Sequence, residues 1–428
     1  MRSTLFYIPH ADPFWNIPLF GYGWLLMLVA LIGVAVIGYR VYREGWGRSA
    51  LADVPMLLVF AAVVGWAAPL LEQPAAAGPP LGIPIRAYGV MVLLGIAGGI
   101  AISVQQARRM GVHPEIMFAI CFWIIVAGFI GARTFYVLQK WEQFACPTFR
   151  ETVFKIVNLT DGGLVVYGGF IGAVLASVCF VRKHHLPLLA MADLLAPGLM
   201  IGLAFGRIGC LMNGCCWGGE CAANFVGITF PPGSPPYMDQ LDRGSLVGMR
   251  VQEEASSGNM VIREVFPGGL AERQGLKVGD VITGLELPSE EQFNRMRSGE
   301  MVPGATVSIY TQSGHAATWQ FGELPSRSHP VYPAQILSSV NAALICLFLW
   351  AYYPVRRRDG EVFGLLITIY PVTRILLEMI RTDESSILSA NFRWTISQMV
   401  SGLLLVGVTA LWCYLLSRPK GSVLPLGN

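Results

Sequence analysis

The sequence has little charge. Only 13% of its 428 residues are Asp, Glu, Lys or Arg, whereas 54% are hydrophobic. An ordinary soluble domain carries about 25% charged residues, so this chain has too few to cover a water-exposed surface of its size. The composition therefore excludes a soluble enzyme and a disordered chain. Its 30 basic residues nearly balance the 27 acidic ones, which leaves no polybasic patch for nucleic acid.

The usual motifs of intramembrane proteases and metal proteins are also absent. The sequence has no His-Glu-x-x-His string and no embedded Ser–His pair, which disfavours an intramembrane protease. A cysteine cluster lacks paired Cys-x-x-Cys knuckles; its members are Cys210, Cys215, Cys216 and Cys221. An oxidising compartment favours a disulfide among them, ahead of free thiols and then zinc. We predict neither a metal nor a cofactor.

Long apolar runs are what the sequence has instead. Nine runs approach the ~20 residues that a helix needs to cross a bilayer. They lie near 19–39, 54–71, 88–106, 115–138, 163–181, 188–207, 331–353, 362–380 and 394–416. They are continuously apolar, unlike the alternating strands of a membrane barrel. The first run follows a polar, Pro-containing stretch, so we interpret it as a span rather than a signal peptide.

Basic residues predict the orientation of these spans. They fall on alternate short loops, which places them all on one side of the membrane, and that side should be the cytoplasm. The residues are Arg40, Arg43, Arg48, Arg108, Arg109, Arg182, Lys183, Arg356, Arg357, Arg358, Arg418 and Lys420. The N-terminus is therefore expected in the periplasm and the C-terminus in the cytoplasm.

A stretch at about 208–330, on the outer side, has the charge density of a soluble protein. Its short runs at 260–265 and 306–310 are typical of strands between glycine turns. The string at 267–282, with its Gly-Leu-Lys-Val-Gly-Asp turn, resembles the PDZ family, which binds peptides by strand addition. The resemblance implies a ligand loop near 246–249. Both a peptide-binding insert and a purely structural one remain open.

Arginines gather at the outer ends of the predicted spans. Arg in a spanning helix is costly and usually functional. Five lie at this depth: Arg86, Arg133, Arg207, Arg374 and Arg381. Glu378 is the single nearby acid, so positive charge is in excess. Guanidinium forks suit a phosphate ester, which indicates a pocket for an anionic phospholipid headgroup. A structural alternative pairs Glu378 with Arg374 or Arg381 and lets the other arginines snorkel.

One helical stripe carries four of these polar residues. Tyr370, Arg374, Glu378 and Arg381 follow one another at helical spacing. Together with Tyr88, Tyr167 and Asn213, they sit toward one face of the membrane. Polar residues at one face, rather than at the midplane, disfavour a transporter.

Glycine-rich strings surround these residues and carry a family resemblance. Residues 206–218 read Gly-Arg-Ile-Gly-Cys-Leu-Met-Asn-Gly-Cys-Cys-Trp-Gly. This is similar to Gly-Arg-x-Gly-Asn-Phe-x-Asn-Gly-Glu-x-x-Gly, the signature of the prolipoprotein diacylglyceryl transferase family. Further matches follow in family order: Arg86-Ala-Tyr88-Gly89, Gly131-Ala-Arg133 with Tyr136, the glycine run at 161–172, the loop at 230–234, Pro333-Ala-Gln335, and the string from Tyr370 to Arg381.

The resemblance implies a bacterial inner-membrane enzyme. Such an enzyme moves the sn-1,2-diacylglyceryl group of phosphatidylglycerol to the lipobox cysteine of a prolipoprotein and releases glycerol-1-phosphate. The implied catalytic residues are Arg207 and Arg374, which hold the phosphate, and Glu378, which orients an arginine. Tyr167 is our own further catalytic candidate, as a proton relay. The implied lipid-binding residues are Arg86, Tyr88, Arg133, Asn213, Gly218, Tyr370 and Arg381. The partners are phosphatidylglycerol, the lipobox signal peptide, and a possible peptide ligand of the insert.

Several positions depart from the family pattern. The family has His where this chain has Tyr167, and Asn and Glu where it has Cys210 and Cys215; a further family His is Tyr332 here. The first change removes the obvious base for a thiol, which reacts as the thiolate. A catalytically altered or inactive relative, binding anionic lipid or peptide at the outer face, therefore remains the alternative.

The expected organisation is an all-α polytopic membrane protein of about nine helices with a small α/β insert on the periplasmic side. Residues 1–75 form an extra N-terminal helical hairpin. Residues 76–240 and 326–428 form the two parts of the membrane core. Residues 241–325 form the PDZ-like insert between them.

Overall fold

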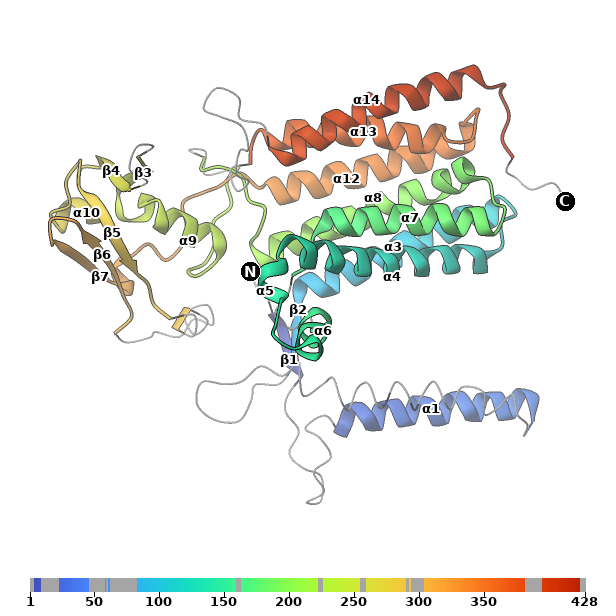
Figure 1. The fold of residues 1–428 in the computed structure, drawn as a ribbon, viewed down its shortest axis with the longest axis horizontal. Helices are drawn as coiled ribbons and strands as arrows, with labels where there is room; N and C mark the ends of the chain where they lie inside the picture. The colour runs from blue at the N-terminus through green and yellow to red at the C-terminus, as the bar shows by residue number, and fades with distance from the viewer. Residues whose placement is uncertain are drawn as a thin grey trace. The chain divides into compact units, whose positions relative to one another are not determined.

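The computed structural model describes residues 4–8, 23–45, 58, 61, 83–158, 163–221, 226–254, 259–289, 292–293, 304–381 and 395–423. Long helices dominate these residues (Figure 1). They are α1 (Gly23–Glu44), α3 (Ala87–Arg109), α4 (Pro114–Gln139), α7 (Val166–Lys183), α8 (Leu188–Asn213), α12 (Ala334–Tyr352), α13 (Glu361–Glu378) and α14 (Ile396–Ser417). Short helices are α5 (Trp141–Phe144), α6 (Phe149–Val157), α9 (Pro235–Asp242), α10 (Leu270–Arg273), η3 (Ser245–Val247), η4 (Phe321–Glu323) and η5 (Tyr353–Val355).

Six helices of the described residues are long and apolar enough to cross a bilayer, so the chain is a polytopic membrane protein. Each predicted run from 88 onward coincides with a helix, and the first run coincides with α1. The run at 54–71 lies outside the described residues apart from Leu58 and Ala61. Helix α13 is not one of these six, because it contains three charged residues, Glu361, Arg374 and Glu378. The count of nine spans stays a prediction.

The chain divides into two compact units, and each is considered by itself. The first comprises Met1–Ser3, Val90–Phe118 and His185–Asn428; the second comprises Thr4–Gly89 and Ala119–His184. In the first unit, α12 packs along α8, and α13 packs against both α12 and α14. These elements carry Arg207 of the signature string and Arg374 of the stripe, and Arg381 follows directly after α13.

Glycines bring α3 and α8 into close contact in the first unit. A Cβ atom on Gly99 would lie 2.8 Å from the carbonyl oxygen of Gly198, and one on Gly95 would lie 2.9 Å from that of Gly202. Both helices thus carry two glycines four residues apart, the small-residue spacing that lets membrane helices approach each other. The close approach fixes the line along which α8 crosses its neighbour.

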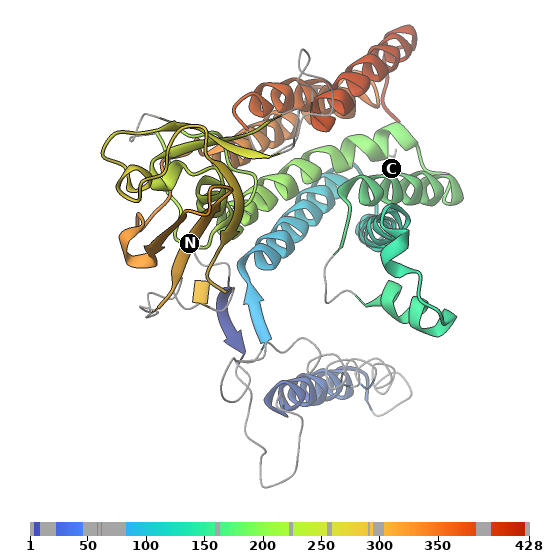
Figure 2. The ribbon, with the colours of Figure 1, turned by 60° about the vertical axis from the view of Figure 1, so that its left-hand side comes forward.

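The second unit packs α7 against α4 in a similar way. Side chains at Gly168, Gly172 or Gly131 would collide with backbone of the facing helix. The glycine run at 161–172 therefore contains packing glycines. The same unit contains an antiparallel pair that the sequence did not lead us to expect. Strand β1 (Thr4–Ile8) pairs with β2 (Ile83–Arg86), which leads directly into α3 (Figure 2).

The insert is a five-stranded antiparallel sheet in the order β3-β4-β5-β6-β7. Its strands are β3 (Met249–Glu253), β4 (Met260–Val265), β5 (Val281–Glu286), β6 (Thr306–Thr311) and β7 (Ala316–Gln320). The two predicted strands are confirmed as β4 and β6. Its core is centred on the buried Trp319, and α9 contributes Tyr237 and Leu241. The core therefore begins ahead of the predicted boundary at 241.

Candidate active site

The stripe on α13 forms a buried ion-pair cluster. Oε2 of Glu378 lies 2.8 Å from Nη1 of Arg374 and 3.4 Å from Nη1 of Arg381. Only 3% of Glu378 and 9% of Arg374 are exposed. Nη2 of Arg374 donates to Oγ of Ser397 on α14 at 2.9 Å. The helical spacing predicted this proximity, and the neighbouring helix fixes the rotamer of Arg374.

Arg207 joins this cluster from α8. It lies within electrostatic range of Arg374, as do Arg381 and Tyr370. Among the described residues, no hydrogen bond or ion pair holds its half-buried guanidinium. Arg207 thereby joins Arg374 and Arg381, which both pair with Glu378. The structural alternative predicted that Glu378 would pair with an arginine, and it does; among the described residues of this cluster, three arginines accompany that one acid.

The end of the signature string is clamped between two helices. Gly214 ends α8 in the left-handed conformation that favours glycine. Downstream, Nε2 of Gln335, at the start of α12, donates to the carbonyl of Cys215 at 2.8 Å. The N–H of Gly218 donates to the carbonyl of Tyr332 at 3.1 Å. A Cβ on Gly218 would lie 2.6 Å from Cβ of Tyr332, so only glycine fits there.

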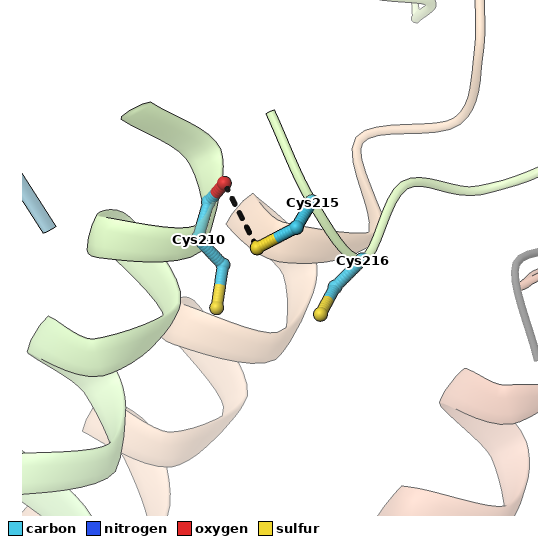
Figure 3. A group of neighbouring side chains, drawn as sticks. All are labelled: Cys210, Cys215 and Cys216. Atoms are coloured by element: carbon cyan, nitrogen blue, oxygen red, sulfur yellow. Dashed lines mark hydrogen bonds between the residues drawn. The ribbon is translucent and has the colours of Figure 1, made fainter. Parts of the chain in front are cut away.

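Three thiols meet in this loop. The sulfur atoms of Cys210, Cys215 and Cys216 all lie within 4.8 Å of one another (Figure 3). No disulfide joins any cysteines of the described residues, so the predicted disulfide is not present in this structure. Hydrogen bonds from the other two thiols, followed by the charges of Arg381 and Arg207, lower the pKa of Cys216 below its ordinary value. Cys221 is not part of the group.

Arg133, in the second unit, has a different environment. Its guanidinium donates to the backbone carbonyls of Lys155, Ile156, Asn158 and Gly163 at 2.6 to 3.1 Å. Three of these carbonyls belong to the end of α6, where a cation is favourable. Arg133 thereby ties the loop before α7 to α4, and its donors are occupied by backbone.

The remaining predicted site residues lie at helix ends. Arg86, Tyr88 and Tyr167 belong to the second unit, at the starts of α3 and α7, and all are exposed. Asn213 is exposed at the end of α8 and interacts with the Cys215 side chain. The structure therefore brings together Arg207, Tyr370, Arg374, Glu378, Arg381 and the signature loop within one unit.

The loop expected to bind a peptide in the insert is closed by its own backbone. The N–H groups of Val247 and Met249 donate to the carbonyl of Gly244, and that of Gly248 donates to Ser245. Two residues further on, the N–H of Val251 donates to the carbonyl of Arg243 at 3.1 Å. These backbone donors are therefore occupied within the segment itself.

The insert also touches the signature loop. Oγ of Ser245 donates to Oε1 of Glu220 at 2.9 Å. A cleft of about 400 Å³ separates residues 217–220 from the start of the insert, and Arg250 and Phe266 line its insert side. The insert is therefore positioned against the loop that follows α8, which carries two of the three thiols, Cys215 and Cys216.

Two contacts at the site did not follow from the sequence analysis. Gln335 belongs to a recognised motif, but no role was assigned to it. Its motif was the signal that could have placed it at the loop. Ser397 gave no signal, because a serine within an apolar run is common, and only packing of α14 on α13 brings it to Arg374.

Comparison with known proteins decides the family. A family model described as prolipoprotein diacylglyceryl transferase matches residues 79–414. The chain belongs to this family. A phosphatidylglycerol–prolipoprotein diacylglyceryl transferase of Rhodopirellula baltica is 35% identical over 451 residues, covering 98% of this chain and 90% of that protein.

Proteins with the same name from other bacteria match shorter segments. The Deinococcus radiodurans protein is 34% identical over 36% of this chain and 46% of its own length. The Gloeobacter violaceus protein is 36% identical over 31% of this chain and 48% of its own length. As a member of the diacylglyceryl transferase family, the chain is a multi-pass bacterial membrane transferase. The relation to the Rhodopirellula protein also extends across the insert.

Proposed function

We propose that this protein transfers the sn-1,2-diacylglyceryl group of phosphatidylglycerol to the lipobox cysteine of prolipoproteins at the outer face of the inner membrane. The observation that carries the proposal is the half-buried guanidinium of Arg207, which lies close to the buried pair of Arg374 and Glu378 and, among the described residues, has no hydrogen-bond or ion-pair partner of its own. A buried charge needs a partner. A phosphate headgroup supplies that partner, and membership of the family names the lipid.

The proposed chemistry is one substitution at carbon. The cysteine thiolate of the prolipoprotein attacks the glyceryl carbon, a carbon–sulfur bond forms, and the bond from that carbon to the phosphate oxygen breaks. The electron pair leaves with glycerol-1-phosphate. Arg207 and Arg374 would stabilise the negative charge that grows on this leaving group, while Glu378 holds Arg374 in place.

Other residues take supporting parts in this proposal. Tyr370 and Arg381 would line the headgroup site, and Asn213 and Gly218 would shape the loop beside it. Arg86 and Tyr88 would bind lipid from the second unit, and Tyr167 would relay the thiol proton. For Arg133 the occupied donors favour a refined role, which is to order the loop before α7 rather than to touch the phosphate.

We propose the topology that the basic loops indicate, with nine spans, the N-terminus outside and the C-terminus inside. The arginine cluster then lies at the outer leaflet, beside the insert. A reporter enzyme active only in the periplasm, fused after residue 428, should be inactive, and activity there would contradict this orientation.

From the extent of its core, we place the insert at residues 235–324. We propose that it is a PDZ-like domain in which the backbone N–H groups of the ligand loop are already bonded to the loop's own carbonyls. Peptide addition to β3 would first have to displace the Gly244 turn. The domain would instead brace the signature loop through Ser245 and Glu220. The full-length protein should not bind a pool of peptides with free apolar C-termini, and micromolar binding would contradict this part.

The activity is tested with purified protein, phosphatidylglycerol vesicles and a lipobox peptide. We expect a diacylglyceryl mass gain on the peptide cysteine, and its loss in Arg207→Ala. Arg273→Ala, which removes an exposed guanidinium from the insert, is the matched control and should keep activity. No mass gain, with phosphatidylglycerol still bound, would instead identify a catalytically inactive lipid-binding relative.

A further inference from the structure

The thiol group of Cys210, Cys215 and Cys216 has no part in the proposed substitution. Each of the three offers one sulfur, and all three sulfurs lie within 4.8 Å of one another. Figure 3 shows them converging from the last turn of α8 and from the loop that follows it. Three thiols gather at one point, and two of them, Cys210 and Cys215, stand where the family carries Asn and Glu, so the group calls for a reason other than packing.

The backbone holds this arrangement at a conformational cost. Cys216 adopts a φ of +60°, which L-residues with a side chain rarely do. Strain of this kind persists where the surroundings impose it and is concentrated at functional sites. Its neighbour Cys215 is fixed by the hydrogen bond from Gln335 to its carbonyl at 2.8 Å, and Cys210 by the helix. The donor set is therefore built before any ligand arrives.

The spacing of the sulfurs suits a metal ion. A cation bound to three sulfurs at about 2.3 Å would hold them about 4 Å apart in a plane. The sulfur atoms now lie within 4.8 Å of one another. To reach the metal-bound spacing they need to move closer by less than about 1 Å, and rotation of the side chains alone can supply that movement. A disulfide would use two of the sulfurs and leave the third unexplained.

Charge and softness then select the ion. Three thiolates around a monovalent or divalent cation keep a net negative charge, and Arg207 and Arg381 lie close enough to Cys216 to compensate it. Thiolate sulfur is a soft ligand that selects zinc and cuprous copper over calcium, magnesium and manganese.

We propose that Cys210, Cys215 and Cys216 bind one thiophilic cation, either zinc or cuprous copper, through their three sulfur atoms. Three protein ligands complete a trigonal cuprous site. For zinc they leave a fourth position to water or an exogenous ligand. This site does not depend on the transferase activity proposed above, because its evidence is the donor set alone.

The test uses the full-length protein in detergent, reduced and freed of metal with a chelator. Cobalt serves first as a spectroscopic probe, and a sulfur-to-cobalt charge-transfer band should reach its maximum at one equivalent per chain. Zinc and cuprous copper are then added in separate competitions with chelators of known affinity. The ion that still displaces cobalt in the presence of the tighter-binding chelator is assigned as the ion of this site.

Variants assign the ligands. Cys210→Ser and Cys216→Ser should each weaken metal binding by at least about 100-fold, because even outer-shell changes at metal sites cost roughly 10- to 100-fold. Cys413→Ser, at an exposed thiol on α14, should bind like the parent protein. Circular dichroism of the metal-free variants separates a lost ligand from a lost fold.

Three results would overturn the proposal. The reduced protein could fail to bind cobalt, zinc and cuprous copper above chelator competition. Binding could be unchanged in Cys216→Ser. The protein isolated without reductant could have a mass lower by two hydrogens and yield a linked Cys210–Cys216 peptide, which would make the group a disulfide. Loss of transfer activity with metal binding intact would bear on the proposed function and leave this site standing.

Discussion

The two ends of α8 and α13 both bury charge, and among the described residues only one end matches its cations with acids and backbone groups. At the starts of the helices, the carboxylate of Asp193 accepts the N–H groups of Gly360 and Phe363 at 2.7 and 2.8 Å. Nε of Arg356 lies 3.8 Å from the same carboxylate. Asp193 thus supplies from α8 the cap that α13 lacks in its own sequence.

At the other end, the part of the chain that the structure describes holds more arginines than acids. Glu378 pairs with Arg374 and Arg381, and Arg207 lies within electrostatic range of Arg374. A buried network whose groups satisfy one another stabilises an architecture, whereas one with excess charge of one sign requires a ligand of the other. The contrast therefore favours a structural role for the Asp193 end and supports the proposed lipid site at the Arg207 end. Two variants test this contrast directly, and two more extend it to Arg133 and to the glycine contact of α8.

The largest effect is expected at the balanced end. Asp193→Ala removes the acceptor of two backbone N–H groups and the carboxylate facing Arg356, so it should lower the free energy of unfolding by about 3 to 5 kcal/mol. Thermal unfolding in detergent measures this. Glu115→Ala, at an exposed acid on α4, should unfold like the parent. An unchanged melting temperature for Asp193→Ala would remove the distinction between the ends.

The next effect falls on activity at the Arg207 end. Arg207→Ala should lower kcat/KM for diacylglyceryl transfer by about 100- to 1,000-fold, because a donor to the developing phosphate charge is lost. The melting temperature should stay within about 2 °C of the parent, since no hydrogen bond or ion pair of the described residues is broken. A stability loss equal to that of Asp193→Ala would make Arg207 another structural arginine.

Arg133 separates the two kinds of arginine within the second unit. Arg133→Lys keeps the charge but leaves several of the four carbonyls without a donor, so stability should fall by about 2 to 3 kcal/mol. The KM for phosphatidylglycerol should change less than twofold. Arg150→Lys, on the exposed face of α6, is the control. A large rise in KM with unchanged stability would restore Arg133 to the lipid site.

The smallest effect concerns the glycine contact that aligns α8. A methyl group in Gly99→Ala would meet the carbonyl oxygen of Gly198 at 2.8 Å, and such overpacking costs about 1 kcal/mol or more. Gly407→Ala, on α14 with open space around it, should be neutral or slightly stabilising. Equal behaviour of the two variants in thermal unfolding would show that α3 and α8 separate readily.

Much of the membrane part could be predicted from the sequence. In lipid, a helix is the one element, apart from a closed barrel, whose backbone N–H and C=O groups find their hydrogen-bond partners internally. The helices from 88 onward followed from the length of apolar runs alone. The pair β1–β2 did not, since five residues next to Pro9 give no periodic signal and their partner strand lies 75 residues further along the chain.

The candidate site likewise has some features that the sequence predicted and others that it did not. Spacing along one helix was enough to join Arg374, Glu378 and Arg381, because residues three and four apart share a face. The signature string indicated that Arg207 and the loop belong with them, but not how. The occupied donors of Arg133 and the tertiary cap of Asp193 required contacts between segments more than 20 residues apart.

The sequence by itself therefore determined that the protein lies in a membrane, where most of its long helices run, and to which family it belongs. These depend on composition, on local periodicity and on short strings, all of which are carried by neighbouring residues. Only the tertiary structure decided which backbone carbonyls occupy the donors of Arg133 and that Arg207 lies close to Arg374. It also decided that three thiols meet, because both outcomes depend on which side chains from distant helices compete for the same space.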